Sequence, residues 1–188
     1  MNAPSGLAAG PIIETERLIL RPPRLEDFEA WAEFYEDADA VKFIGGALPK
    51  AVSWRNLCGA VGAWTLQGFS MFSVIEKATG RWVGRLGAHY PYDWPGTEVG
   101  WAVVRDCWGK GYAYEAASAS MDFAVDVLGW TEVIHCIDPE NHPSRRLAER
   151  LGSTILRQAT LPPPVETHTV DIWGQSADQW RARRAVSP

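Results

Sequence analysis

The stretch that decides the fold lies at 108–117 and reads Trp108-Gly109-Lys110-Gly111-Tyr112-Ala113-Tyr114-Glu115-Ala116-Ala117. Its two glycines predict a tight turn, and the alanine-rich run after them predicts a helix over 114–128. Glycines tolerate positive φ and let backbone N–H groups approach an anion, while the helix directs its positive dipole end to the same place. The turn therefore predicts a phosphate or pyrophosphate site, although a Gly-x-Gly pair also occurs in turns that bind nothing.

Two better-known phosphate motifs do not match this turn. A P-loop requires GxxxxGK[ST], whereas Lys110 is followed by Gly111, with no Ser or Thr for magnesium. The dinucleotide fingerprint requires a small third residue where this chain has Tyr114. Neither motif fits.

Strands and helices are predicted on both sides of the turn from the spacing of apolar residues. Strands are expected at 17–21, 69–76, 82–90, 97–104, 131–137, 153–158 and 167–173, and further helices at 25–37, 51–66 and 142–151. This order predicts an α/β (α+β) fold, a mixed sheet with helices on both faces. We expect a flexible N-terminal tail over 1–11, a single domain over 12–180 and a C-terminal tail over 181–188.

The composition excludes several classes of protein. The chain has 188 residues, of which 46% are hydrophobic and 22% charged, and its net charge is −5. A net charge of −5 does not favour nucleic-acid binding, which requires a basic face. No apolar run approaches the length that is needed to span a membrane. Three distant cysteines, an odd number, favour a reducing compartment over a disulfide framework. With no signal peptide expected at the start, we predict a cytoplasmic protein that binds neither nucleic acid nor membrane.

Four blocks in this order resemble the GNAT acetyltransferases, and within them the RimJ/RimL-type branch. The blocks are the turn at 108–117 and Glu98-Val99-Gly100-Trp101, Asn141-His142-Pro143-Ser144 and Glu149-Arg150-Leu151-Gly152. The opening at 15–22 and Gln179-Trp180 are also similar to that branch. The resemblance covers about 12–180 and implies a GNAT-like, mostly antiparallel central sheet of about seven strands.

The resemblance also implies acetyl-CoA (CoA) as cosubstrate and an N-acetyltransferase activity. The CoA pyrophosphate would be bound by the backbone N–H groups of Gly109, Lys110, Gly111, Tyr112 and Ala113. The pantetheine arm would pair, like an added strand, with the backbone around Trp101, Val103 and Val104. Trp108 stands where family members usually have Gln or Arg, and the RimJ/RimL-type branch often has Trp there. No metal is expected, because the histidines lack metal-ligand spacing.

Acetyl transfer to an amine requires a base, because an ammonium carries no lone pair with which to attack a thioester. Glu98 is the candidate, on the strand that leads to the turn, and the resemblance implies that it acts through a water molecule. The alternative is an exposed strand carboxylate in an ordinary salt bridge.

The departing thiolate requires an acid. Many family members have Tyr seven residues after the Asn of the third block, where this chain has Ala148. The branch it resembles offers Ser144 instead, with Asn141 on the pantetheine amide. Helix capping is the simpler role for Asn141, and water could replace Ser144.

We therefore expect transfer of an acetyl group to a primary amine, either a protein N-terminus or a small amine. Two other functions stay open at this point. One is a catalytically idle acyl-CoA-binding regulator, because the tyrosine is missing at Ala148. The other is a protein-interaction module whose Gly-x-Gly turn binds nothing. The identity of the amine and the formation of a homodimer are also left open.

Overall fold

The computed structural model describes residues 10–163, 165 and 169–186. Its strands are β1 (Ile13–Glu14), β2 (Leu18–Arg21), β3 (Met71–Glu76), β4 (Trp82–His89), β5 (Glu98–Val103), β6 (Glu132–Ile137), β7 (Thr154–Thr160) and β8 (Thr169–Ser176). Its helices are α1 (Phe28–Glu36), α2 (Lys50–Gln67), α3 (Tyr112–Asp122), α4 (His142–Leu151) and α5 (Ala177–Val186). Short 3-10 helices lie at Leu25–Asp27 and Arg105–Cys107, and a π-helical turn at Phe123–Val127 follows α3.

The sheet has the strand order β1-β2-β3-β4-β5-β6-β8-β7. The pair β5/β6 is parallel, whereas β1/β2, β2/β3, β6/β8 and β7/β8 are antiparallel. The predicted mixed, mostly antiparallel sheet is confirmed. It has eight strands where about seven were expected, because β1 is only two residues long and too short to show alternation.

The described residues form two compact units. One contains the chain up to Leu86 together with Ala102–Tyr112, and the other contains Gly87–Trp101 together with the residues from Ala113 onward. The chain passes between the units within β4, within β5 and at the start of α3. The expectation of a single domain over 12–180 stays a prediction.

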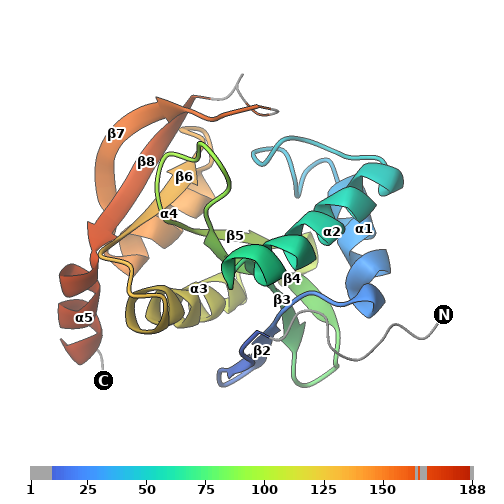
Figure 1. Cartoon of the computed structure of the whole chain (residues 1–188), viewed down its shortest axis with the longest axis horizontal. Coiled ribbons are helices and arrows are strands. Elements are labelled where there is room, and N and C mark those ends of the chain that lie inside the picture. The colour runs from blue at the N-terminus through green and yellow to red at the C-terminus, as the bar shows by residue number, and fades with distance from the viewer. Residues whose placement is uncertain (1–9, 164, 166–168, 187–188) are drawn as a thin grey trace. The chain divides into compact units, whose positions relative to one another are not determined.

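The first unit has its core on the paired helices α1 and α2, which lie side by side in Figure 1. The aromatic residues of α1 recur at helical spacing, and Trp31, Phe34 and Tyr35 are buried with Leu57 of α2 and Trp82 of β4. Both helices were predicted from this spacing. The burial explains why α1 forms, since an amphipathic helix is stabilised mainly by packing of its apolar face.

The second unit places β6, β8 and β7 side by side, with α4 packed against β6 (Figure 1). Helix α4 has the predicted bounds, because Asn141 caps its start and Gly152, with φ +93°, ends it. Residues 181–186, expected within a tail, instead form the end of α5. Ion pairs from Arg184 to Asp122 and Asp126 attach this helix to the end of α3 and the π-turn. The predicted strand at 167–173 begins at Thr169, and 167 and 168 lie outside the described residues.

Candidate active site

The glycine turn has the conformation that its sequence predicts. Gly109 has φ +75° and Gly111 has φ +81°, values that side chains other than glycine rarely adopt. A β-carbon at Gly109 would meet no atom within 4 Å, so that side of the turn is open. Helix α3 begins at Tyr112, two residues earlier than predicted, directly after Gly111. The first N–H groups of a helix lack a carbonyl partner within the helix, and the N-terminal end of a helix is a common site of anion binding.

An arginine from the start of the chain holds this turn. Arg17 Nη1 donates a hydrogen bond of 2.8 Å to the Lys110 carbonyl, and its guanidinium lies 4.6 Å from the centre of the Tyr112 ring. The Tyr112 hydroxyl donates to Glu76, and this hydrogen bond raises the pKa of Tyr112. The pKa of Glu76 is lowered by hydrogen bonds from Thr79 and Tyr112. Arg17 lies in the block at 15–22 that resembles the RimJ/RimL-type branch, but no role for it was predicted.

The strand end before the turn is only partly available to a ligand. The Val104 N–H donates to the Val83 carbonyl at 3.0 Å, so this N–H belongs to the sheet, and the contact of the Val104 backbone with pantetheine stays a prediction. The Val103 carbonyl already accepts a 2.9 Å hydrogen bond from the Trp108 indole N–H. Trp108 therefore acts at the end of β5 as a structural side chain.

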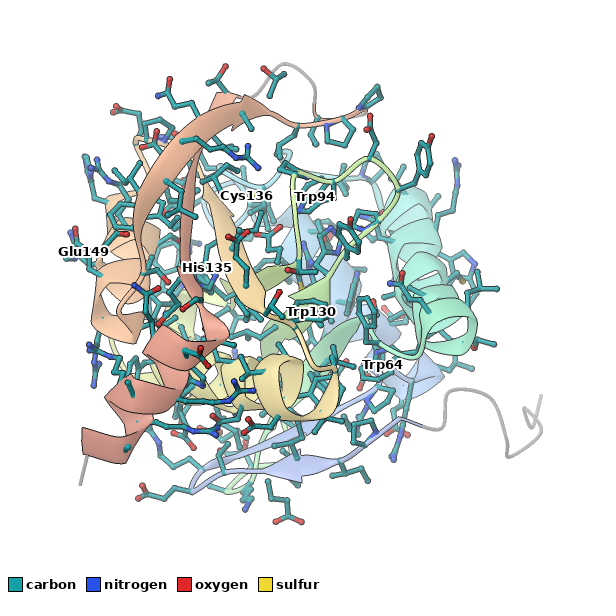
Figure 2. The ribbon with its side chains drawn as sticks, turned by 60° about the vertical axis from the view of Figure 1, so that its left-hand side comes forward. Trp64, Trp94, Trp130, His135, Cys136 and Glu149 are labelled. Atoms are coloured by element: carbon teal, nitrogen blue, oxygen red, sulfur yellow. The ribbon has the colours of Figure 1, made fainter. Side chains whose placement is uncertain are left out.

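Glu98 lies in the second unit and is 6% exposed. Its carboxylate accepts hydrogen bonds from the Trp94 indole N–H at 2.5 Å and from the Cys136 backbone N–H at 3.0 Å. Both donor residues are labelled in Figure 2, where Cys136 lies on β6 and Trp94 on the loop that precedes β5. Donors of this kind favour the ionised carboxylate. The alternative of an exposed strand carboxylate is wrong, because Glu98 is buried.

The Cys136 thiol lies close to the same carboxylate, which affects its pKa. Burial raises the pKa of its thiol strongly, and the nearby negative charge of Glu98 raises it further. The thiol is therefore protonated at neutral pH and is a poor nucleophile.

His135 is a buried polar residue for which the sequence predicts no role beyond the absence of metal-ligand spacing. Its Nδ1 lies 2.7 Å from the Val99 carbonyl, and its Nε2 lies 3.1 Å from Ser153 Oγ. A carbonyl only accepts, so Nδ1 carries the hydrogen and Nε2 accepts from the Ser153 hydroxyl. Burial lowers the pKa of His135 to about 4, so the ring is neutral at pH 7. A histidine within an apolar strand could have indicated a buried polar contact from the sequence alone. Its partner, the Val99 carbonyl, could not be predicted because it depends on the register of β5 and β6.

Ser144 and Asn141 meet at the start of α4. Asn141 Oδ1 accepts the Ser144 N–H at 3.2 Å, which confirms the capping role. The Trp101 indole N–H donates to Ser144 Oγ at 3.1 Å, and the Trp101 ring lies 4.7 Å from that of His135. Because the indole nitrogen is a donor only, this contact does not use the Ser144 hydroxyl hydrogen.

Ala148 occupies the position at which the resemblance would place a tyrosine. This residue is 0% exposed and packs with Ile137 and Trp173 beneath α4. An aromatic ring would not fit there without moving these neighbours.

The candidate residues thus fall into two sets. The first unit holds Val103, Val104, Gly109, Lys110, Gly111 and Tyr112, and the second holds Glu98, Trp101, Ala113, Asn141 and Ser144. Within the described residues, no three His, Cys, Asp or Glu side chains are grouped to bind a metal ion. Over that same part of the chain, no helix has the length and apolar character to cross a membrane.

The sequence matches the family model of the acetyltransferase (GNAT) domain over residues 17–154. The chain belongs to the GNAT acetyltransferases. This family uses acetyl-CoA, and the match includes the glycine turn, Glu98 and Ser144.

Relatives of this GNAT acetyltransferase are found in several bacteria. The chain is 31% identical to uncharacterized N-acetyltransferase p20 of Bacillus licheniformis, over 73% of this chain and 79% of that protein. It is 29% identical to uncharacterized N-acetyltransferase YnaD of Bacillus subtilis, over 74% and 81% of the two chains.

Solved structures share its fold. The acetyltransferase of Agrobacterium tumefaciens is 28% identical and superimposes with a TM-score of 0.76, over 88% of this chain and 94% of that one. A GNAT-family acetyltransferase of Bacillus anthracis is 25% identical with a TM-score of 0.74, over 89% and 99%. This chain therefore has the fold of these acetyltransferases.

Proposed function

We propose that this enzyme is a cytoplasmic N-acetyltransferase of the RimJ/RimL-type branch that transfers the acetyl group of acetyl-CoA to a primary amine. The observation that carries the proposal is the glycine turn at the start of α3, where two positive-φ glycines directly precede the N-terminal end of a helix. The amine is a protein N-terminus or a small amine. A ribosomal-protein-S5-alanine acetyltransferase of Vibrio fischeri shares the fold, with a TM-score of 0.69 and 15% identity over 90% of this chain and 98% of that one.

The donor would be held mainly by backbone groups. The N–H groups of residues 109–113 bind the pyrophosphate, and Arg17 keeps the turn in place through its hydrogen bond to the Lys110 carbonyl. The open space beside Gly109 fits a ligand that approaches the backbone closely. The backbone of Trp101 and the Val103 N–H pair with the pantetheine amides, and the Asn141 side-chain NH₂ donates to the same arm.

Glu98 would receive the proton of the amine. Amines of this kind have a pKa of about 8 to 10, so most acceptor molecules are protonated at neutral pH. Because Glu98 is 6% exposed, the proton reaches it through ordered water rather than by direct contact. The N–H donors from Trp94 and Cys136 hold the carboxylate in place on β5.

Ser144 would supply the proton for the thiolate. Its oxygen already accepts from Trp101, so its hydroxyl hydrogen is available for a negatively charged sulfur. Direct attack of the amine on the thioester then needs no covalent enzyme intermediate. The acceptor nitrogen loses two protons: the ammonium gives one to Glu98 through water before attack, and the nitrogen gives up a second as the C–N bond forms and the C–S bond breaks. Ser144 gives its hydroxyl proton to the departing thiolate and is reprotonated by this second proton through solvent.

The idle acyl-CoA-binding regulator remains the second candidate, because Ala148 is buried where a family tyrosine would stand. Both functions predict that CoA raises the melting temperature of the protein by mass action. Only the enzyme releases thiol from acetyl-CoA when a suitable amine is added. An amine panel with acetyl-CoA, read by thiol release, therefore separates the two, and protein without amine serves as the control.

A further inference from the structure

The parallel pairing of β5 and β6 stops after one register pair. Glu98 pairs with Ile134, and the Ile134 N–H donates to the Thr97 carbonyl at 2.9 Å. In a parallel ladder of this register, the next bond would join the Cys136 N–H to the Val99 carbonyl.

Both of these backbone groups instead form hydrogen bonds with side chains. The Cys136 N–H donates to the Glu98 carboxylate at 3.0 Å, and the Val99 carbonyl accepts from His135 Nδ1 at 2.7 Å. Successive side chains of a strand alternate between the two faces, so Glu98 acts from the face of Ile134 and His135 from the opposite face. Neither backbone group is left unpaired, and the ladder ends without cost to hydrogen bonding.

The imidazole is fixed in this position by its own neighbours. The Ser153 hydroxyl donates to His135 Nε2, and Gln175 Nε2 donates to Ser153 Oγ at 3.0 Å and to the Leu151 carbonyl at 3.0 Å. The Trp101 ring packs against the imidazole. His135 is 1% exposed, so no water competes for its hydrogen.

We propose that His135 is a positioning residue that keeps β6 from pairing with β5 beyond Val99, which leaves the backbone edge of β5 at Trp101 open for the pantetheine arm of acetyl-CoA. The inference rests on the proposed function, since it assigns the edge to that donor. Thr97, Val99 and Trp101 direct their backbone groups to the same side of β5, because this direction repeats every second residue. The same imidazole supports the Trp101 ring, whose indole N–H holds Ser144.

Loss of the Nδ1–H donor should close this edge. The Val99 carbonyl would then lack a partner, and the Cys136 N–H, which donates to Glu98 in the parent, is the group that the β5/β6 register offers. Acetyl-CoA could then bind only to the fraction of molecules in which this new hydrogen bond is broken. The apparent affinity for CoA should therefore fall on the order of tenfold for one hydrogen bond.

The test is CoA titration by calorimetry of the parent and three variants, at a temperature where circular dichroism shows each of them folded. His135→Phe removes the donor. His135→Asn places an amide N–H where Nδ1 was and should restore binding. Ser153→Ala is the matched control, because it removes a hydrogen bond of the same network but leaves the bond to Val99.

We expect CoA affinity to fall on the order of tenfold in His135→Phe and to stay close to the parent in the other two variants. Equal affinity in the parent and a folded His135→Phe would overturn the inference, and so would an equal loss in Ser153→Ala. A parent that does not bind CoA would overturn the proposed function instead.

A second measurement does not depend on the folding of any variant. Nitrogen-15 NMR of His135 in the parent should report the neutral tautomer with hydrogen on Nδ1. The Nε2–H tautomer would overturn the inference, because Nδ1 could then not donate to Val99.

Discussion

Replacing Glu98 by Gln tests the general base with the least change in shape. The Gln side chain keeps an oxygen for the Cys136 N–H, so the end of the β5/β6 ladder is preserved. It removes the negative charge and replaces one acceptor oxygen by an NH₂ group, which cannot accept from Trp94. The lost hydrogen bond should lower the free energy of unfolding by about 1–3 kcal/mol.

The rate effect follows from the burial of Glu98. General-base loss costs about 10²–10⁴ in rate, and a base that is 6% exposed and works through water lies near the lower end. We therefore expect kcat/KM to fall on the order of 100-fold at pH 7, a barrier increase of about 2.7 kcal/mol. CoA affinity should change little. The deficit should shrink as the pH rises toward the pKa of the acceptor amine, because solvent then supplies the free amine.

The assay is thiol release from acetyl-CoA across neutral to alkaline pH, with Glu98→Ala as the comparison. Alanine removes both the charge and the acceptor for the Cys136 N–H, so it should weaken CoA binding as well as turnover. A Glu98→Gln profile that runs parallel to that of the parent at similar height would refute the base assignment.

Three further predictions concern the donor turn, the leaving thiolate and the buried histidine. Gly111→Val forces a β-branched residue to φ +81°, at a cost of about 1–2 kcal/mol, and should weaken CoA binding in a folded protein; unchanged CoA affinity by calorimetry would contradict the backbone site. Ser144→Ala should lower kcat more than donor affinity, and turnover equal to that of the parent would assign the proton to water. His135 has a folded-state pKa of about 4, below the usual 6.5, so the unfolded chain binds more protons between these pH values. The free energy of unfolding should therefore fall by about 3 kcal/mol from this group as the pH drops from 7 to 4, and a urea-unfolding difference between parent and His135→Asn that is flat over this range would contradict the buried neutral ring.

The sequence predicts best where local chemistry decides the structure. Asn141 and Gly152 set both ends of α4, and the two turn glycines have the positive φ that their spacing implied. The sequence predicts less where the partner is distant. The His135 contact with Val99 depends on the register between β5 and β6, and no spacing along the chain fixes that register. A strand of two residues such as β1 is likewise decided by its partner strand rather than by its own pattern.

The burial of Glu98 was missed for a related reason. Its position on the strand was predicted, but the Trp94 indole that covers it comes from a loop whose course depends on Asp93, with φ +63°. A non-glycine residue in that conformation is uncommon and is not read from sequence. The chemistry of the candidate site was therefore predictable by residue type, whereas the contacts that tune it were not.

Mass spectrometry of the acceptor tests the central claim most directly. The protein is incubated with acetyl-CoA and a panel of amines that includes peptides with free N-termini, polyamines and amino acids, with Glu98→Gln as the matched variant. We predict that at least one amine gains one acetyl group on nitrogen, in step with thiol release, and that Glu98→Gln forms this product far more slowly at neutral pH. Tight CoA binding with no acetylated amine and no thiol release across the panel would contradict the account.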